Sequence, residues 1–125
     1  MTLAFVDDGQ MRELNRRFRR KDRTTDVLSF GDDLPKGARG LEAARRLAPG
    51  LDGITHLGDV VISGAQAARQ ARRRRWPLGS EVAFLAAHGT LHLLGFEDDT
   101  RAGYREMLAL GRSAVAASRQ QRVNR

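Results

Sequence analysis

Hydrophobic and polar positions along the chain predict strands and helices in alternation. Short runs of β-branched and other apolar residues predict strands at residues 2–6, 25–30 and 57–62. Segments with apolar residues three or four positions apart predict helices over about 9–18, 64–76, 81–94 and 100–117. This alternation indicates one α/β unit, a single domain spanning 1–125.

The ends of these predicted helices carry residues that favour capping. Asp7 and Asp8 come before the first helix, where acidic side chains suit the unpaired amide groups. Ser63 and Ser80 stand at the expected N-cap positions of the helices over 64–76 and 81–94. Gly95 follows the second of these helices and suits a left-handed C-terminal cap.

The first predicted helix is amphipathic. Met11, Leu14 and Phe18 occur at i, i+3 and i+7, which places them in one stripe of the helix surface. Arginines occupy other positions of the same helix. We therefore expect this stripe, including Phe18, to pack against the sheet.

Two segments are predicted to lack regular packing. Residues 31–56 are rich in glycine and mixed charges, which favours an irregular loop or insertion with a short helical piece over 41–47. Residues 118–125 are polar, and we expect a flexible tail there.

Charge suggests a class of partner without deciding it. The chain has 22 Lys and Arg residues against 15 Asp and Glu, a net charge of +7, and all but two of the basic residues are arginine. Guanidinium groups suit phosphate, which favours nucleic-acid binding. A genome of high GC content also favours arginine codons, so composition alone leaves both explanations open.

Other features of the composition exclude several kinds of site. The chain has no cysteine, so it has no disulfides, no thiol nucleophile and no thiolate metal site. A metal site must use histidine and carboxylates. No apolar run approaches the roughly 20 residues of a membrane span, and residues 2–8 do not resemble a signal peptide. We expect a soluble, cytoplasmic protein that does not bind membranes.

The segment 88–99, HGTLHLLGFEDD, carries the strongest chemical signal. His88 and His92 are four residues apart on a predicted helix, which puts both imidazoles on one face. Gly95 ends that helix and lets the chain turn back toward the imidazoles. A third metal ligand is then available from one of three carboxylates, Glu97, Asp98 or Asp99.

This pattern, H-x-x-x-H-x-x-G-x-x-D, also occurs in metalloprotease helices. In those helices the residue after the first histidine is a glutamate that acts as general base. Here that residue is Gly89. We therefore rank peptide hydrolysis below a chemistry in which a metal and a cationic side chain do most of the work.

Three ordered blocks resemble the YbeY-type rRNA-maturation endoribonucleases. Residues 88–98, HGTLHLLGFED, are similar to the family pattern H-G-x-L-H-L-x-G-Y-D-H. Residues 14–30, LNRRFRRKDRTTDVLSF, are similar to L-N-x-x-[YF]-R-x-K-D-x-x-T-D-V-L-S-F, and residues 57–62, LGDVVI, form a third match. Together with the gaps between them, the blocks cover about 3–117.

The resemblance implies a zincin-like α/β (α+β) fold, with a small mixed sheet, packed helices and a metal site on the helix that carries HxxxH. It further implies a metal-dependent, single-strand-specific endoribonuclease that acts in 16S rRNA 3′-end maturation and ribosome quality control. The implied partners are rRNA and ribosomal particles. Carried over by position, His88, His92 and Asp98 would hold one zinc ion, which polarises a phosphoryl oxygen or activates a water, and Arg19 would stabilise the scissile phosphate.

Two departures from the family pattern matter. Asp98 stands where the family has histidine, and its harder carboxylate oxygen admits divalent metals other than zinc. This change keeps an alternative open: a catalytically weak RNA-binding ribosome-assembly factor with a structural metal. Family members also usually have a strand and a helix before the segment that matches residues 2–6. Either Met1 is a misassigned start or the chain is shortened, which would expose a sheet edge or face and leaves the oligomeric state open.

Several further residues are candidates with open alternatives. Arg72, Arg73 and Arg75 form either an RNA-backbone contact or a solvated helix end. Asp59 either accepts a hydrogen bond from a metal-ligating histidine or forms a turn at a strand end. Asp99 is a further candidate to accept such a hydrogen bond, besides being an alternative ligand.

Overall fold

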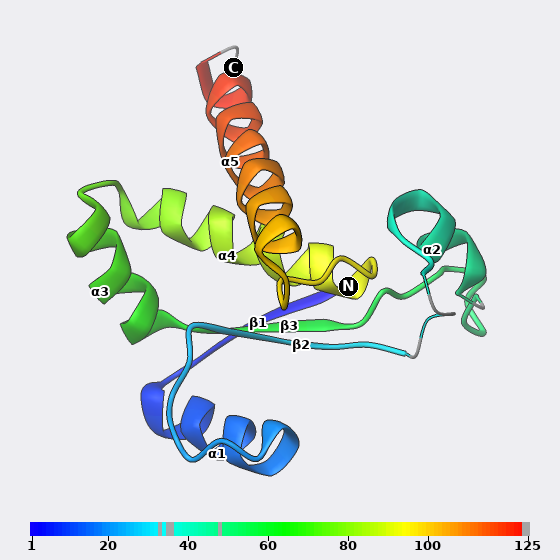
Figure 1. The fold of residues 1–125 in the computed structure, drawn as a ribbon, viewed down its shortest axis with the longest axis horizontal. Helices are drawn as coiled ribbons and strands as arrows, with labels where there is room; N and C mark the ends of the chain where they lie inside the picture. Colours follow the sequence, from blue (N-terminus) through cyan, green and yellow to red (C-terminus); the bar gives the residue numbers. More distant parts are fainter. Residues whose placement is uncertain (33, 35–36, 48, 124–125) are drawn as a thin grey trace.

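A computed structural model describes residues 1–32, 34, 37–47 and 49–123. Strands and helices alternate along the first part of the chain, and further helices follow without strands between them, as Figure 1 shows. The elements are β1 (Thr2–Val6), α1 (Asp8–Arg19), β2 (Val27–Phe30), α2 (Gly40–Arg46), β3 (Asp59–Ser63), α3 (Gly64–Arg74), α4 (Leu78–Leu93) and α5 (Arg101–Val123). The predicted α+β fold class is confirmed.

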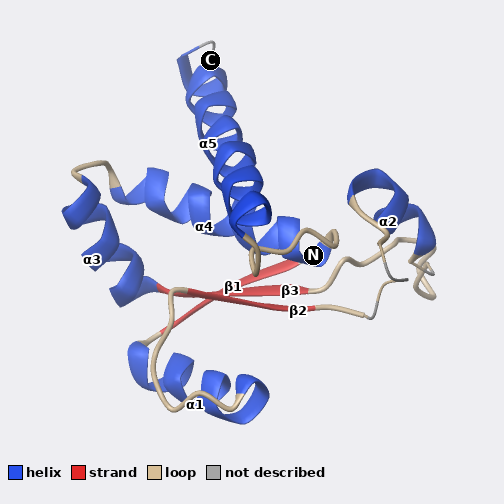
Figure 2. Ribbon diagram, in the orientation of Figure 1, coloured by secondary structure: helices blue, strands red, loops and turns tan. Residues whose placement is uncertain are grey.

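The three strands form a mixed sheet in the order β1-β3-β2. β1 runs parallel to β3, whereas β2 runs antiparallel to it. Helices α3, α4 and α5 lie on one side of the sheet and α1 on the other, as Figure 2 shows. β1 and β2 are therefore the two edges, and Leu3 and Phe5 of β1 are exposed.

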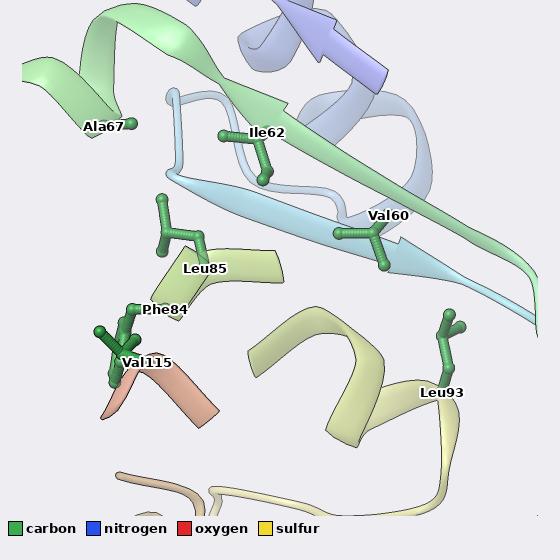
Figure 3. Packing of buried hydrophobic residues seen from close by; sticks show 7 residues of the cluster. All are labelled: Val60, Ile62, Ala67, Phe84, Leu85, Leu93 and Val115. Atoms are coloured by element: carbon green, nitrogen blue, oxygen red, sulfur yellow. The ribbon is translucent and has the colours of Figure 1, made fainter. Parts of the chain in front are cut away.

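The core lies between the sheet and α4. Val60 and Ile62 alternate along β3 and point to the same face, where both are fully buried. Figure 3 shows them with the other members of the cluster, which come from α3, α4 and α5: Ala67, Phe84, Leu85, Leu93 and Val115. This packing positions α4, and with it the HxxxH segment, over the middle of the sheet.

Gly89 lets α4 approach the sheet closely. A Cβ atom built on Gly89 would lie 2.6 Å from Val60 Cγ1 and 3.1 Å from the hydroxyl oxygen of Ser29. The Ser29 hydroxyl donates a hydrogen bond to the Gly89 carbonyl oxygen at 2.9 Å. The position after His88 thus faces the sheet, and it has no room for the glutamate of the metalloprotease pattern.

The predicted caps are mostly confirmed. Asp7 caps α1 in a capping box with Gln10, and the Ser63 hydroxyl accepts from the backbone N–H of Gln66 at the start of α3. The prediction for Ser80 is wrong. α4 begins at Leu78, directly after Pro77, and Ser80 lies buried inside the helix. Proline fixes its own backbone angle and can precede a helix without a capping side chain.

The expectation for Phe18 is also wrong. Met11 is fully buried, but Phe18 at the other end of the apolar stripe is 54% exposed. Phe18 lies in the last turn of α1, where its ring contacts the ring of Phe30 at the end of β2. The stripe therefore buries Met11 at its N-terminal end, whereas Phe18 contacts the sheet only at the end of β2 and remains more than half exposed.

The two segments predicted to be irregular differ from each other. Helix α2 confirms the short helical piece within 31–56, although residues 33, 35, 36 and 48 lie outside the described part. α5 continues to Val123, so the helix is longer than predicted and takes in most of 118–125; residues 124 and 125 are not described. None of the helices in the described ranges combines the length and the apolar composition needed to cross a bilayer.

Candidate metal centre

Helix α4 and the turn after it bring three donor atoms together. The Nε2 atoms of His88 and His92 lie 3.2 Å apart, as their i, i+4 spacing requires. The Asp98 Oδ2 atom lies 3.3 Å from the first of these nitrogens and 3.6 Å from the second. The predicted constellation is therefore a single cluster.

The turn at Gly95 puts Asp98 in this position. Gly95 has a φ of +89°, a left-handed conformation that side chains disfavour, and a Cβ there would lie 2.2 Å from the carbonyl oxygen of Ala38. The chain reverses after this residue. Among the three carboxylates left open by the sequence, Asp98 is the one whose oxygen joins the two imidazoles, while Glu97 and Asp99 line the surrounding cleft.

This donor set fits a divalent metal. Ligand bonds of about 2.0 to 2.2 Å in a tetrahedral arrangement place neighbouring donors about 3.3 to 3.6 Å apart. The three observed separations, 3.2, 3.3 and 3.6 Å, come close to that range. Two imidazoles and one carboxylate also leave a coordination position for a further ligand. The cluster can hold a metal, and its chemistry is compatible with zinc and with harder divalent ions.

The surroundings favour the form of each imidazole that binds metal. The Nδ1–H group of His92 donates to the Phe96 carbonyl oxygen at 3.0 Å, so the Nε2 atom keeps its lone pair for a metal. Burial, and after it the neighbouring His92, lower the pKa of His88, while Asp98 and Asp26 act in the opposite direction. A neutral His88 is the form that coordinates metal. No sequence signal could have indicated the Phe96 carbonyl, because it belongs to the backbone.

Arg19 reaches the same cleft from a different element. It is the last residue of α1, and its guanidinium donates to the Ser29 carbonyl oxygen at 2.8 Å. This bond fixes the charge at the end of β2. Arg19 lines the same cleft as His88 and His92.

The cleft itself is open and has a volume of about 1260 Å³. Sequence reasoning did not single out several of its residues, among them Asp26, Ser29 and Arg39. The Arg39 guanidinium pairs with the Glu106 carboxylate and lies 4.4 Å from the centre of the Phe96 ring. These residues come from β2, from the segments flanking it and from α5, so only the fold reveals them as neighbours.

Other candidate residues lie outside the cleft. Asp59 begins β3, is exposed, and is not hydrogen-bonded to His88 or His92 in the part of the chain that the structure describes. Arg72, Arg73 and Arg75 are exposed at the end of α3. They precede α4, whose rise of about 1.5 Å per residue separates its first turn from His88 by about 15 Å. These arginines are not among the residues that line the cleft with the metal donors.

Comparison with known proteins decides the family. The family model described as Endoribonuclease YbeY matches residues 1–118. The chain belongs to the YbeY family of endoribonucleases. Its members are RNA-cleaving hydrolases by name, and this agrees with the low rank given to peptide hydrolysis. An endoribonuclease YbeY from Moorella thermoacetica is 42% identical over 116 residues, which cover 93% of this chain and 70% of the relative.

A second YbeY relative, from Myxococcus xanthus, is 44% identical over 111 residues, or 88% of this chain and 33% of that protein. The chain thus spans between a third and about 70% of these two YbeY proteins. The solution structure of a Thermotoga maritima protein, TM1509, matches with a TM-score of 0.54 at 22% identity, covering 95% of this chain and 70% of that one. This structural match supports the fold.

Proposed function

We propose that this chain is a metal-dependent endoribonuclease that cuts single-stranded RNA. Its proposed substrate is precursor 16S rRNA at the 3′ end, within ribosomal particles in the cytoplasm, with a further role in ribosome quality control. Membership of the YbeY family supports the reaction class. The proposal for the substrate rests on the resemblance of the three sequence blocks.

One observation carries the proposal: the three metal donors and the Arg19 guanidinium line one cleft. Of the five N–H donors of Arg19, one is used by the Ser29 carbonyl, and others remain for a phosphate oxygen. A fixed guanidinium stabilises the negative charge that builds on phosphorus as the nucleophile attacks. We assign this role to Arg19.

His88, His92 and Asp98 are the residues that would hold the metal, with zinc as the proposed ion. When bound, the ion would supply Lewis-acid chemistry at the phosphate. The protein holds Nε2 of His92 in the ligating tautomer through Phe96, and burial keeps His88 neutral. Asp98 adds a negative charge that offsets part of the charge of the ion.

The proposal is tested by separating phosphate stabilisation from metal binding. Arg19→Glu is expected to abolish cleavage of a single-stranded RNA while leaving the metal content unchanged. Arg45→Glu makes the same change of charge on α2 and serves as the matched control. Equal cleavage by the two variants would reject the role of Arg19.

A second experiment distinguishes the enzyme from an assembly factor. RNA cleavage and RNA affinity are measured before and after chelation of the metal. An endoribonuclease loses cutting on chelation and regains it when zinc is added back. Retained RNA affinity with no chelator-sensitive cutting would instead favour an RNA-binding assembly factor. In cells, accumulation of unprocessed 16S rRNA 3′ ends with the Arg19→Glu variant tests the substrate.

A further inference from the structure

Two aromatic rings stand together at the edge of the cleft. The rings of Phe18 and Phe30 lie with their centres 5.2 Å apart and their planes at 72°. Phe18 is 54% exposed although its position in α1 predicted burial. The edge-to-face arrangement leaves ring faces that neither phenylalanine covers for the other. Phe30 is half-buried, so Phe18 is the exposed ring of the pair, and its exposure needs a reason because burial would be more favourable.

The pair is placed directly beside the catalytic cleft. Arg19, next to Phe18 in the chain, lines the cleft, and so do Ser29 and Gly31, the two neighbours of Phe30. Phe18 belongs to the last turn of α1 and Phe30 ends β2, two elements that can be found in Figure 1. Neither phenylalanine lines the cleft itself, and Arg19 is the residue that links the cleft wall to the pair.

Positive charge surrounds the rings. The Arg17 guanidinium carbon lies 6.0 Å from the centre of the Phe18 ring, and that of Arg19 lies 5.6 Å from the centre of the Phe30 ring. Arg20 and Lys21 follow at the end of α1 and are exposed. An exposed aromatic ring, that of Phe18, next to several cations matches the two parts of a nucleotide, a flat base and a phosphate.

We propose that Phe18 and Phe30 form a stacking subsite for an unpaired RNA base next to the phosphate held by Arg19. The inference rests on the proposed function, because the subsite would bind the nucleotide next to the cleavage point of the same RNA substrate. The Arg19 charge and the Phe30 ring are close enough for the phosphate and the base of neighbouring nucleotides to engage both. A base within a duplex cannot expose its face to these rings, so the subsite favours single strands.

The test compares variants that differ in the ring and little else. Phe18→Leu keeps an apolar side chain but removes the ring, whereas Phe18→Tyr keeps the ring. The matched control is Phe5→Leu, because Phe5 is 56% exposed on β1, at the opposite edge of the sheet. The probes are a single-stranded RNA with 2-aminopurine next to the cleavage point and the same RNA with an abasic nucleotide there. Thermal unfolding of each variant checks the fold.

Phe18→Leu is expected to weaken binding of the 2-aminopurine RNA about tenfold, because the stacking of one base is lost. The quenching of 2-aminopurine fluorescence on binding should disappear as well. Phe18→Tyr and Phe5→Leu should bind like the parent protein. The abasic RNA should bind the parent and Phe18→Leu equally. Equal affinity of Phe18→Leu and Phe5→Leu for the 2-aminopurine RNA would overturn the subsite. Weaker binding of the abasic RNA by Phe18→Leu than by the parent protein would overturn it as well.

Binding and quenching need no RNA cutting, so they are measured with chelator present and separately from cleavage. Quenching that depends on Phe18, in a protein that never cuts RNA, would support the subsite and reject the proposed enzyme. Cutting that depends on Arg19 but not on Phe18 would support the enzyme and overturn the subsite. An RNA-independent effect of Phe18→Leu, such as loss of a protein partner with unchanged RNA affinity, also overturns it.

Discussion

The Ser29 hydroxyl donates to the Gly89 carbonyl oxygen at 2.9 Å, and this bond joins β2 to α4 beside the metal centre. The carbonyl oxygen of the same serine accepts from Arg19 at 2.8 Å. Ser29 therefore connects the guanidinium proposed to bind phosphate with the helix that carries His88 and His92. The relative position of these groups depends on one small residue that is not itself a ligand.

Ser29→Ala is expected to lower kcat/KM for single-stranded RNA about tenfold. Arg19 keeps its bond to the backbone carbonyl of residue 29, but α4 loses its hydrogen bond to β2 and can shift relative to Arg19, and such misalignment is costly. Loss of one hydrogen bond should cost only about 0.5 to 1.5 kcal/mol of stability. Steady-state cleavage, metal analysis and chemical unfolding measure the three effects. Ser113→Ala, an exposed serine on α5, is the control. A fall in bound metal as large as the fall in kcat/KM would contradict a positioning role for Ser29.

Asp98 is expected to be the third metal ligand. Asp98→Ala should lower zinc affinity by at least about tenfold, since one of three protein ligands is lost. Asp98→His should restore zinc binding and weaken manganese binding, because imidazole is the softer donor. Calorimetric titration with each metal measures these affinities. Asp99→Ala is the matched control, and a larger loss of zinc with this control would transfer the ligand role to Asp99.

Gly89→Ala is expected to destabilise the protein by about 1 to 3 kcal/mol, the usual cost of overpacking. The added Cβ would meet Val60 at 2.6 Å, so α4 must move away from the sheet. The same substitution at Gly64, the first residue of α3, meets nothing within 4 Å and should be neutral or slightly stabilising. Urea unfolding of both variants provides the comparison. Similar free energies of unfolding would mean that α4 adjusts freely.

Acid stability should depend on Asp8. Hydrogen bonds from Arg69 and then Ser63 lower the pKa of Asp8 below its ordinary value of 3.8. Ionised Asp8 therefore stabilises the folded protein above pH 3.8, and this contribution is lost as the pH falls through the lower folded pKa. Asp8→Asn should lower Tm at neutral pH, with a difference that shrinks below pH 3.8. A constant difference in Tm over the whole acidic range would speak against this linkage.

The arginines at the end of α3 are expected to contact RNA only when the substrate is long enough to reach past α4. The double variant Arg72→Ala, Arg73→Ala should bind a long single strand with a weaker salt dependence. The slope of the logarithm of affinity against the logarithm of salt concentration should become less steep by about 1.4, or about 0.7 for each lost phosphate contact. A short RNA that fills only the cleft should show no change. The double lysine variant keeps the charge and is the control. An unchanged slope with the long RNA would indicate a solvated helix end.

Local sequence patterns were enough to predict the strands, most of the helices and their caps, and the turn at Gly95, because residues close together in the chain determine these features. The three strands and most helix positions follow from periodicity, and the caps at Asp7 and Ser63 follow from side chains three residues from their partners. The i, i+4 spacing of His88 and His92 sets their distance along one helix. Gly95 marks a turn because few other residues adopt its backbone angle.

Tertiary packing decided the rest, because it depends on contacts between residues far apart in the chain. Whether Asp98 or its neighbours would meet the imidazoles depended on the path of the turn against Ala38. The exposure of Phe18 depended on where α1 passes the end of the sheet. Ser29 and Gly89 are 60 residues apart, and no local pattern pairs them. The periodicity of the sequence predicts which helix or strand each residue belongs to. The site depends on contacts between several helices and strands, which periodicity does not predict.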